Sequence, residues 1–387
     1  MSSTRSLNIP ASKSTVQVSI IDTTFDAKFP AAYFMGPPIK GFDELTAVAY
    51  AFLVKHVDSV GEERSIVFDL GTPKDVVNDF PPKVAEWFMG MGFMRVEKYV
   101  SEILEESNVA LDSIEAIIWS HAHMDHVGRP SLFPTTAKLI VGPGIKQAFF
   151  PGYPTAPDSQ ILSREFAGRE VAELSLPEFS LDIGGLKALD YFGDGSFYLL
   201  SAPGHAIGHL NALARTTDNT FLYLAGDSVH HLSELRPHAA SHLPQSVALR
   251  GSSRCCPGAA FHAIHPLSDI TKVPDRYHEP LGYPDSTPDT APFFTISQTP
   301  TGESLASDVN DARATIKAVQ RFDADENVFV VAAHDASIRG ILDLFPRTAN
   351  DWKVKGLKEA GRWLFLDDFE EALRLAGENV GDSTRTA

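Results

Sequence analysis

The sequence has little cysteine, no long apolar run and no excess of basic residues. Its only cysteines, Cys255 and Cys256, are adjacent, which suits neither an unstrained disulfide nor the ligand spacing of a cysteine metal site. We therefore expect a reducing compartment, the cytoplasm, and we expect any metal to be held by histidine and carboxylate side chains. No apolar run approaches the roughly 18 residues of a membrane span, and the first segment does not resemble a secretory signal.

Acidic residues outnumber basic ones, with 50 Asp and Glu against 33 Lys and Arg and a formal charge of −17. This balance disfavours nucleic acids and anionic membranes as partners, so the expected partner is a small molecule. The chain has 387 residues, of which 43% are hydrophobic and 21% charged, a composition typical of folded globular proteins. At about 150 residues per domain, it can form two or three domains or one enlarged α/β domain.

Short apolar runs predict strands, with helices between the later ones. The β-rich segments 16–21, 47–55 and 65–69 predict an antiparallel meander. Apolar residues at helical spacing predict helices at 96–104 and 308–322. The runs that predict further buried strands are 116–120, 138–141, 197–201, 221–224 and 328–332.

Residues 236–305 differ from the rest of the chain because Pro, Ser and Thr are frequent and strand signals are weak. A connection this long usually has its own packing or a function, so we expect an insertion that forms a lid over a cleft or the contact of a homodimer. A disordered surface excursion is the alternative. We place the main domain at 15–345, after an N-terminal extension at 1–14. The tail at 346–387 is expected to pack on this domain through a short helix near Phe369.

The segment Ser120–Gly128, which reads Ser-His-Ala-His-Met-Asp-His-Val-Gly, directly follows a predicted buried strand. Imidazole and carboxylate are ligands of Zn, Fe(II) and Mn, and a tight loop at a strand end can direct several of them to one point. His121 and His123 can share one metal, while Asp125 and His126 can turn toward a second. Three further predicted strands are followed by residues of the same kind, namely His205, Asp227 and His334.

Together these residues resemble the pattern of the metallo-β-lactamase superfamily, which is His-x-His-x-Asp-His followed by a His, a bridging Asp and a last His. The resemblance covers roughly residues 15–345. It implies the α/β (α+β) class and an αββα sandwich, in which helices cover two mixed sheets and a dinuclear site lies at one sheet edge. It also implies that one metal is held by His121, His123 and His205, the other by Asp125, His126 and His334, and that Asp227 bridges both.

Four shorter matches extend the resemblance. Asp69-Leu70-Gly71 matches the Asp-x-Gly of the superfamily and implies that Asp69 orients a ligand histidine, with an ordinary turn aspartate as the alternative. The segments Pro37–Lys40, Gly152–Pro154 and Gly226–His231 are similar to those of fungal members that act on xenobiotic or secondary-metabolite lactams and lactones.

His230 stands where acyl-homoserine-lactone hydrolases of the superfamily have a tyrosine that contacts the substrate carbonyl. A neutral histidine can also donate a hydrogen bond to a carbonyl, so we expect this catalytic contact from His230, with a structural role as the alternative. The departure from tyrosine disfavours acyl-homoserine lactones as substrates. The aromatic residues Phe149, Phe150 and Tyr153 are expected either to form a pocket wall or to pack in the core.

The resemblance implies a hydrolase with two divalent ions, most simply Zn²⁺, with Mn²⁺ and Fe²⁺ as alternatives. A metal-bridging hydroxide would open a small lactam or lactone, a xenobiotic of plant or secondary-metabolite origin, and Asp125 would relay a proton to the leaving atom. Thioesters, as in glyoxalase-type or polyketide-releasing hydrolases, are the alternative substrates. A mononuclear persulfide dioxygenase and a non-catalytic binding protein are disfavoured because no ligand of either metal is missing.

Overall fold

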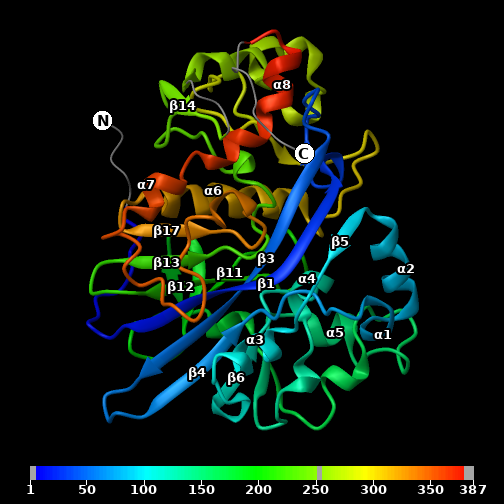
Figure 1. Ribbon diagram of the computed structural model, residues 1–387, viewed down its shortest axis with the longest axis vertical. Helices are drawn as coiled ribbons and strands as arrows, with labels where there is room; N and C mark the ends of the chain where they lie inside the picture. The colour runs from blue at the N-terminus through cyan, green and yellow to red at the C-terminus, as the bar shows by residue number, and fades with distance from the viewer. Residues whose placement is uncertain (1–5, 251–254, 379–387) are drawn as a thin grey trace.

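The computed structural model describes residues 6–250 and 255–378, and within them two large β-sheets pack face to face (Figure 1). The start of the predicted N-terminal extension, 1–5, and the end of the predicted tail, 379–387, lie outside the described residues. No described helix has both the length and the apolar character needed to cross a membrane.

The first sheet is mixed. Strands β1, β3 and β4 pair antiparallel, as the meander predicted, whereas β4, β6, β7 and β8 run parallel. Strand β1 is longer than the predicted 16–21 because an irregularity between Asp22 and Asp26 lets it bend and continue. Across the sheet the strands are β5 (Phe93–Arg95), β1 (Val16–Pro30), β3 (Glu44–Val57), β4 (Glu63–Phe68), β6 (Ile114–Ile118), β7 (Lys138–Val141) and β8 (Val171–Glu173).

The second sheet is antiparallel except at one edge, where β13 and β17 run parallel. These two strands therefore end at the same edge, so the residues that follow them come side by side. Across the sheet the strands are β17 (Val328–Val331), β13 (Phe221–Leu224), β12 (Leu210–Arg215), β11 (Phe197–Ser201), β10 (Leu186–Asp190) and β9 (Leu181–Ile183).

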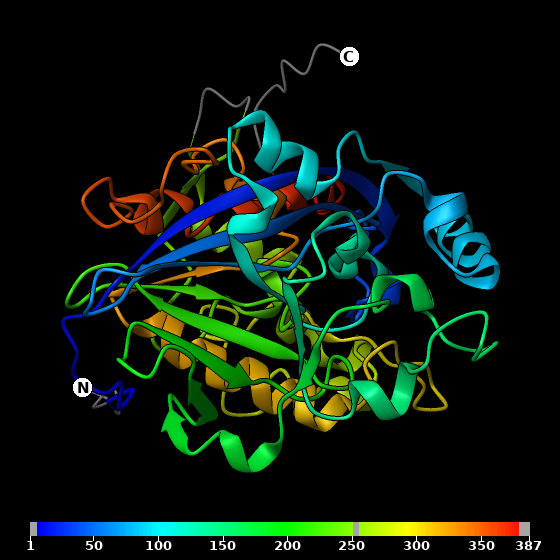
Figure 2. The same cartoon turned by 90° about the horizontal axis from the view of Figure 1, so that it is seen from below.

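Each sheet contributes to two layers of core because successive residues of a strand point to opposite faces. In β13, Leu222 and Leu224 pack between the sheets, whereas Phe221 and Tyr223 pack on the outer face, where α6 lies. Figure 2 shows the green strands of the second sheet between gold α6 and the blue strands of the first sheet. Helices α2, α3 and α5 cover the other outer face, which confirms the αββα sandwich. The helices are α1 (Val76–Asp79), α2 (Pro82–Gly90), α3 (Val100–Glu106), α4 (Met124–Val127), α5 (Ile145–Phe149), α6 (Val309–Ala324), α7 (Leu357–Gly361) and α8 (Glu370–Leu375).

The described part of the predicted insertion forms a layer with the C-terminal tail on the outer side of the second sheet, beyond α6 (Figure 1). It contains the short pair β14 (Ser246–Ala248) and β15 (Cys255–Pro257). The rings of Phe261 and Phe293 pack against Phe369 of the tail, with centroids 6.5 and 4.7 Å away. These rings are buried within one chain, so their burial requires no second copy, and the homodimer stays a prediction.

One end of the insertion supports a loop of the first sheet. Strand β16 (Thr295–Ile296) pairs with β2 (Met35–Gly36), and the Ser297 amide donates to the Phe34 carbonyl at 3.0 Å. The Ser297 hydroxyl donates to the Ala32 carbonyl at 2.6 Å. The position of Phe34 therefore depends on residues about 260 positions later in the chain.

Candidate metal centre and substrate cleft

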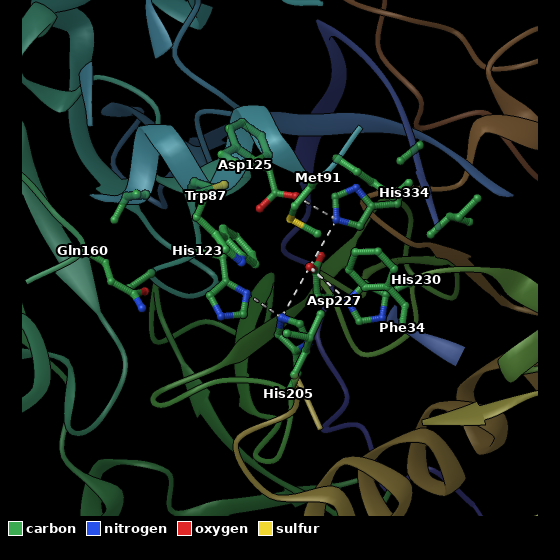
Figure 3. A pocket seen from close by; sticks show the side chains of 18 of the residues that line it. Phe34, Trp87, Met91, His123, Asp125, Gln160, His205, Asp227, His230 and His334 are labelled. Atoms are coloured by element: carbon green, nitrogen blue, oxygen red, sulfur yellow. Dashed lines mark hydrogen bonds and ion pairs between the residues drawn. The ribbon is translucent and has the colours of Figure 1, made fainter. Parts of the chain in front are cut away.

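The seven predicted ligands come together at the edge where β6, β11, β13 and β17 end. They form two groups whose ligand atoms lie within 4.8 Å of one another, and Asp227 belongs to both. In Figure 3 the side chains of His123, His205, Asp125 and His334 surround Asp227. The first group is His121, His123, His205 and Asp227, and the second is Asp125, His126, Asp227 and His334.

The first group centres on His205. Its Nε2 atom lies 3.2 Å from His121 Nε2 and 2.9 Å from His123 Nδ1. The same atom lies 3.4 Å from Asp227 Oδ2. Three imidazole nitrogens and one carboxylate oxygen thus face a common point, as in the ligand set of a first-row divalent metal.

The second group uses the other oxygen of Asp227 as well. Asp227 Oδ1 lies 2.9 Å from His126 Nε2, and Asp227 Oδ2 lies 3.1 Å from His334 Nε2. Asp125 Oδ2 lies 3.4 Å from His334 Nε2. Asp227 Oδ2 therefore lies near both His334 of the second group and His205 of the first, so one carboxylate faces both groups, as a bridging ligand does.

Several ligands are oriented by a second contact behind them. The Asp69 carboxylate lies 2.8 Å from His126 Nδ1 and accepts a hydrogen bond of 2.6 Å from the Ser120 amide. His334 Nδ1 lies 2.7 Å from the Val48 carbonyl. A contact of this kind fixes which ring nitrogen faces a metal. The contact of Asp69 with His126 Nδ1 therefore fits the predicted orienting role.

The buried polar atoms of the two ligand groups fit bound cations. His126 Nε2 and Asp227 Oδ1 are buried and make no hydrogen bond of normal geometry within the described residues, although they face each other. Burial lowers the pKa of His121 and His205 well below the usual range, which keeps these imidazoles neutral and able to ligate. Burial acts to raise the pKa of Asp227, but His126 and His334 outweigh it and hold the carboxylate ionised.

Histidine 209 was not predicted from the sequence. Its Nδ1 donates to the Ala202 carbonyl at 2.8 Å, and its Nε2 accepts the Asp227 amide at 3.1 Å. Burial lowers the pKa of His209 to about 4, so the acceptor stays unprotonated. Gly226, at φ +47°, has no room for a side chain because a Cβ atom would lie 2.8 Å from His209 Nε2. His209 therefore positions the bridging aspartate through its backbone.

The structure places His230 beside the ligands and in the wall of the cleft. Its Nε2 lies 3.7 Å from Asp227 Oδ2, and its ring centroid lies 4.8 Å from that of Phe34. Burial lowers the pKa of His230 to about 4, so the ring is neutral near pH 7. Beneath it, the buried Glu234 carboxylate accepts the His230 amide at 2.7 Å, and burial raises the pKa of Glu234 to about 8.

A cleft of about 490 Å³ opens above the ligand cluster. Its wall away from the ligands is mainly apolar and comes from α2, β1, β3 and the loop before β2. Among the described residues of 236–305, Leu305 lines this cleft, so the body of the insertion does not cover it. The other apolar lining residues include Phe29, Phe34, Leu45, Trp87, Phe88 and Met91.

The three aromatic residues that follow the first motif have different environments. Phe149 lines a second, adjoining cavity. Phe150 instead stacks on Phe166, with ring centroids 3.9 Å apart, and belongs to the core on the outer face of the first sheet. Tyr153 is not among the lining residues of either cavity. Phe149 therefore forms a wall while it also packs against this core, and core packing alone applies to Phe150.

Comparison with known proteins identifies the family. Residues 48–211 match the model of the metallo-beta-lactamase superfamily. The gamma-lactamase FDB1 of Fusarium pseudograminearum is 41% identical over 374 residues, which are 93% of this chain and 84% of that protein. The chain belongs to the metallo-β-lactamase superfamily. Members of this superfamily bind divalent metal ions, in agreement with the donor set described above.

Other relatives of this superfamily member agree in sequence or in fold. The metallo-hydrolase mfmC of Annulohypoxylon moriforme is 39% identical, over 95% of this chain and 91% of its own. Relatives in Penicillium species, named cytochrome P450 monooxygenase mpaDE, match over only 39% of their own length. A solved N-acyl homoserine lactone hydrolase, with N-hexanoyl-L-homoserine at its catalytic metal centre, superposes with a TM-score of 0.53. It is 14% identical, over 87% of this chain and 99% of its own, so it shows the fold alone.

Proposed function

We propose that this superfamily member is a hydrolase that uses two divalent metal ions to open a lactam or lactone ring. The observation that carries the proposal is the position of Asp227, whose carboxylate belongs to two complete groups of ligands and lies near His205 of the first and His334 of the second. Zn²⁺ suits a set of nitrogen and oxygen donors for a reaction without redox change, and Mn²⁺ or Fe²⁺ fits the same donors.

A pair of bound divalent ions supplies a water of lowered pKa and polarises a carbonyl group. His121, His123, His205 and Asp227 would hold one ion, and Asp125, His126, His334 and Asp227 the other. Asp125 lines the cleft and contacts His334 across its floor, so its carboxylate can carry a proton to the leaving nitrogen or oxygen. The neutral His230 can donate a hydrogen bond to the carbonyl, because it lines the cleft next to Asp227.

The relatives support a cyclic amide or ester as the substrate. Two of them are named gamma-lactamases, FDB1 and MBL2 of Gibberella moniliformis, and the second is 44% identical over 53% of this chain. The apolar wall of the cleft suits an uncharged organic ring of xenobiotic or secondary-metabolite origin.

Metal analysis combined with a substrate panel tests the proposal. Protein loaded with Zn²⁺ and desalted should retain two ions per chain, and it should hydrolyse a γ-lactam, a γ-lactone or a cyclic carbamate. Chelation should abolish the activity, and added metal should restore it. One ion or none per chain, or hydrolysis of thioesters in preference to every ring, would overturn the proposal.

A matched pair of histidine variants makes the metal analysis specific. His126→Asn removes a ligand of the second group and should lower the metal content. His242→Asn changes an exposed histidine whose ring lies near the Ala239 carbonyl, outside both groups, and should leave the metal content unchanged.

A further inference from the structure

The cleft is larger than the ring that the proposed reaction opens. A volume of 490 Å³ falls within the range of about 300–1,000 Å³ that buries a drug-sized ligand. A lone five- or six-membered ring bound at the ligand cluster would leave the helix α2 side of the cleft unfilled. The unfilled part is the apolar one, where Trp87, Phe88 and Met91 lie.

The rim of the cleft also exposes apolar side chains to water. Trp87 is 52% exposed and Leu305 is 43% exposed, although both line the cleft. Large apolar side chains in a cavity gain burial only when a ligand covers them, and each covered side chain then adds to affinity. An apolar group of the ligand would cover both residues.

The cleft has a second lobe of different character. This lobe measures about 340 Å³ and shares His123, His205 and Leu305 with the first. It is lined by Phe149, Ile207 and Ser307 and lacks the cluster of aromatic rings found under α2. The two lobes adjoin along the residues that line both, so a substituent can enter one or the other.

We propose that the substrate is a lactam or lactone whose ring carries an aromatic, uncharged substituent, and that this substituent lies beneath α2 against Trp87, Met91 and Phe34. The proposal rests on the proposed function, because the ring is placed at the ligand cluster. Aromatic side chains favour an aromatic partner over an alkyl chain through stacked and edge-to-face contacts. Trp87 is then a specificity-determining residue and takes no part in the chemistry.

The charges of this lobe agree with an uncharged substituent. Lys83 is the cation among its lining residues, and it already pairs with Asp158 at 3.2 Å across the rim. Both side chains are highly exposed. Among the described residues that line this lobe under α2, a charged substituent would find no unpaired buried partner.

Matched substrates with and without the substituent test the proposal. The probes are γ-butyrolactone with its γ-phenyl and γ-pentyl derivatives, and 2-pyrrolidinone with its 5-phenyl derivative. The metal-loaded protein should open the phenyl compounds with a kcat/KM at least about tenfold above that of the parent rings, as expected for burial of one aromatic ring. It should prefer the phenyl to the pentyl lactone.

Two alanine variants locate the substituent. Trp87→Ala should lower kcat/KM about tenfold for the phenyl compounds and less than twofold for the parent rings. Ile207→Ala is the matched control, because Ile207 is an apolar residue of similar exposure, 46% against 52% for Trp87, in the other lobe. Ile207→Ala should change kcat/KM for every probe by less than twofold.

Three results would overturn the proposal: equal rates on parent and phenyl rings, a preference for pentyl over phenyl, or a loss caused by Ile207→Ala and not by Trp87→Ala. If no ring is opened, the proposed function fails, and calorimetric binding of the same probes to metal-free protein still decides the inference. Tighter binding of the phenyl compounds that depends on Trp87 would support it, and binding without that dependence would overturn it.

Discussion

The floor and the roof of the cleft are built in opposite ways. The floor comprises the seven ligands after four strands. Five of them are buried, His123 and Asp125 are partly exposed toward the cleft, and contacts such as Asp69 with His126 fix its rings. The roof, which comprises α2 and the loop with Phe34, leaves Trp87 half exposed and carries the Lys83–Asp158 pair on its outside. Under the proposed function, the floor would determine the chemistry, whereas the roof could change without loss of the reaction and would determine which ring enters.

The largest effect is expected at the carboxylate shared by both ligand groups. Asp227→Asn replaces an oxygen with an amide that cannot ligate as well, so we expect kcat/KM to fall by about 10³-fold or more. The metal content should fall with it. A variant that retains its full metal content and at least a tenth of the activity would show that the floor does not depend on a bridging ligand.

Asp125→Asn should separate chemistry from binding. Because Asp125 is proposed to carry the proton to the leaving group, kcat should fall by about 10² to 10⁴-fold while KM changes little. Steady-state kinetics on metal-loaded protein gives both values. A near-normal kcat with full metal would exclude the proton-relay role.

A smaller effect on metal affinity is expected at Asp69, which contacts a ligand histidine without being a ligand itself. In Asp69→Asn the amide oxygen can still accept the Ser120 amide, but the amide nitrogen faces His126 Nδ1 and favours the wrong tautomer. Changes of this kind cost about 10 to 100-fold in metal affinity or activity. Competition with a chelator measures the affinity, and Asp182→Asn, at an exposed aspartate, is the control. Equal affinities in the two variants would mean that Asp69 is only a turn residue.

The smallest effect is expected at the rim of the roof. Lys83→Ala removes an exposed ion pair of the kind that adds little to stability and is screened by salt. We expect Lys83→Ala to change kcat/KM on an uncharged ring by at most about twofold. Both this value and the melting temperature should change less than in any floor variant. A larger loss would show that the roof is held as rigidly as the floor.

The floor could be predicted from the sequence because its chemistry lies directly after apolar runs. Asp125 and His126 are neighbours in one turn, and His205, Asp227 and His334 each follow a predicted strand within a few residues. Local sequence therefore carries both the element and the ligand. His209 lacked such a signal, since its role depends on a backbone contact with Asp227 made only in the folded sheet.

The roof could not be predicted because it depends on contacts between distant segments. Trp87 and Phe34 are apolar, so a prediction from the sequence would assign them to the core. No pattern in the neighbouring sequence indicates that they face a cavity. Strand β12 was missed because Asn211 and Arg215 interrupt its apolar run, although the folded sheet buries both. The packing of Phe293 on Phe369 likewise joins segments with no common local signal.

The pairing of β2 with β16 has a consequence for how this enzyme family member can adapt. Ser297 and the short strand β16, which precedes Ser297, hold the loop that carries Phe34. The described residues of this segment contribute no predicted metal ligand. Substitutions or length changes in that segment can shift one aromatic wall while the reacting groups stay in place. Under the proposed function, mutations remote from the cleft could thus change substrate selectivity. Laboratory evolution could use these positions to change the preferred ring at little risk to catalysis.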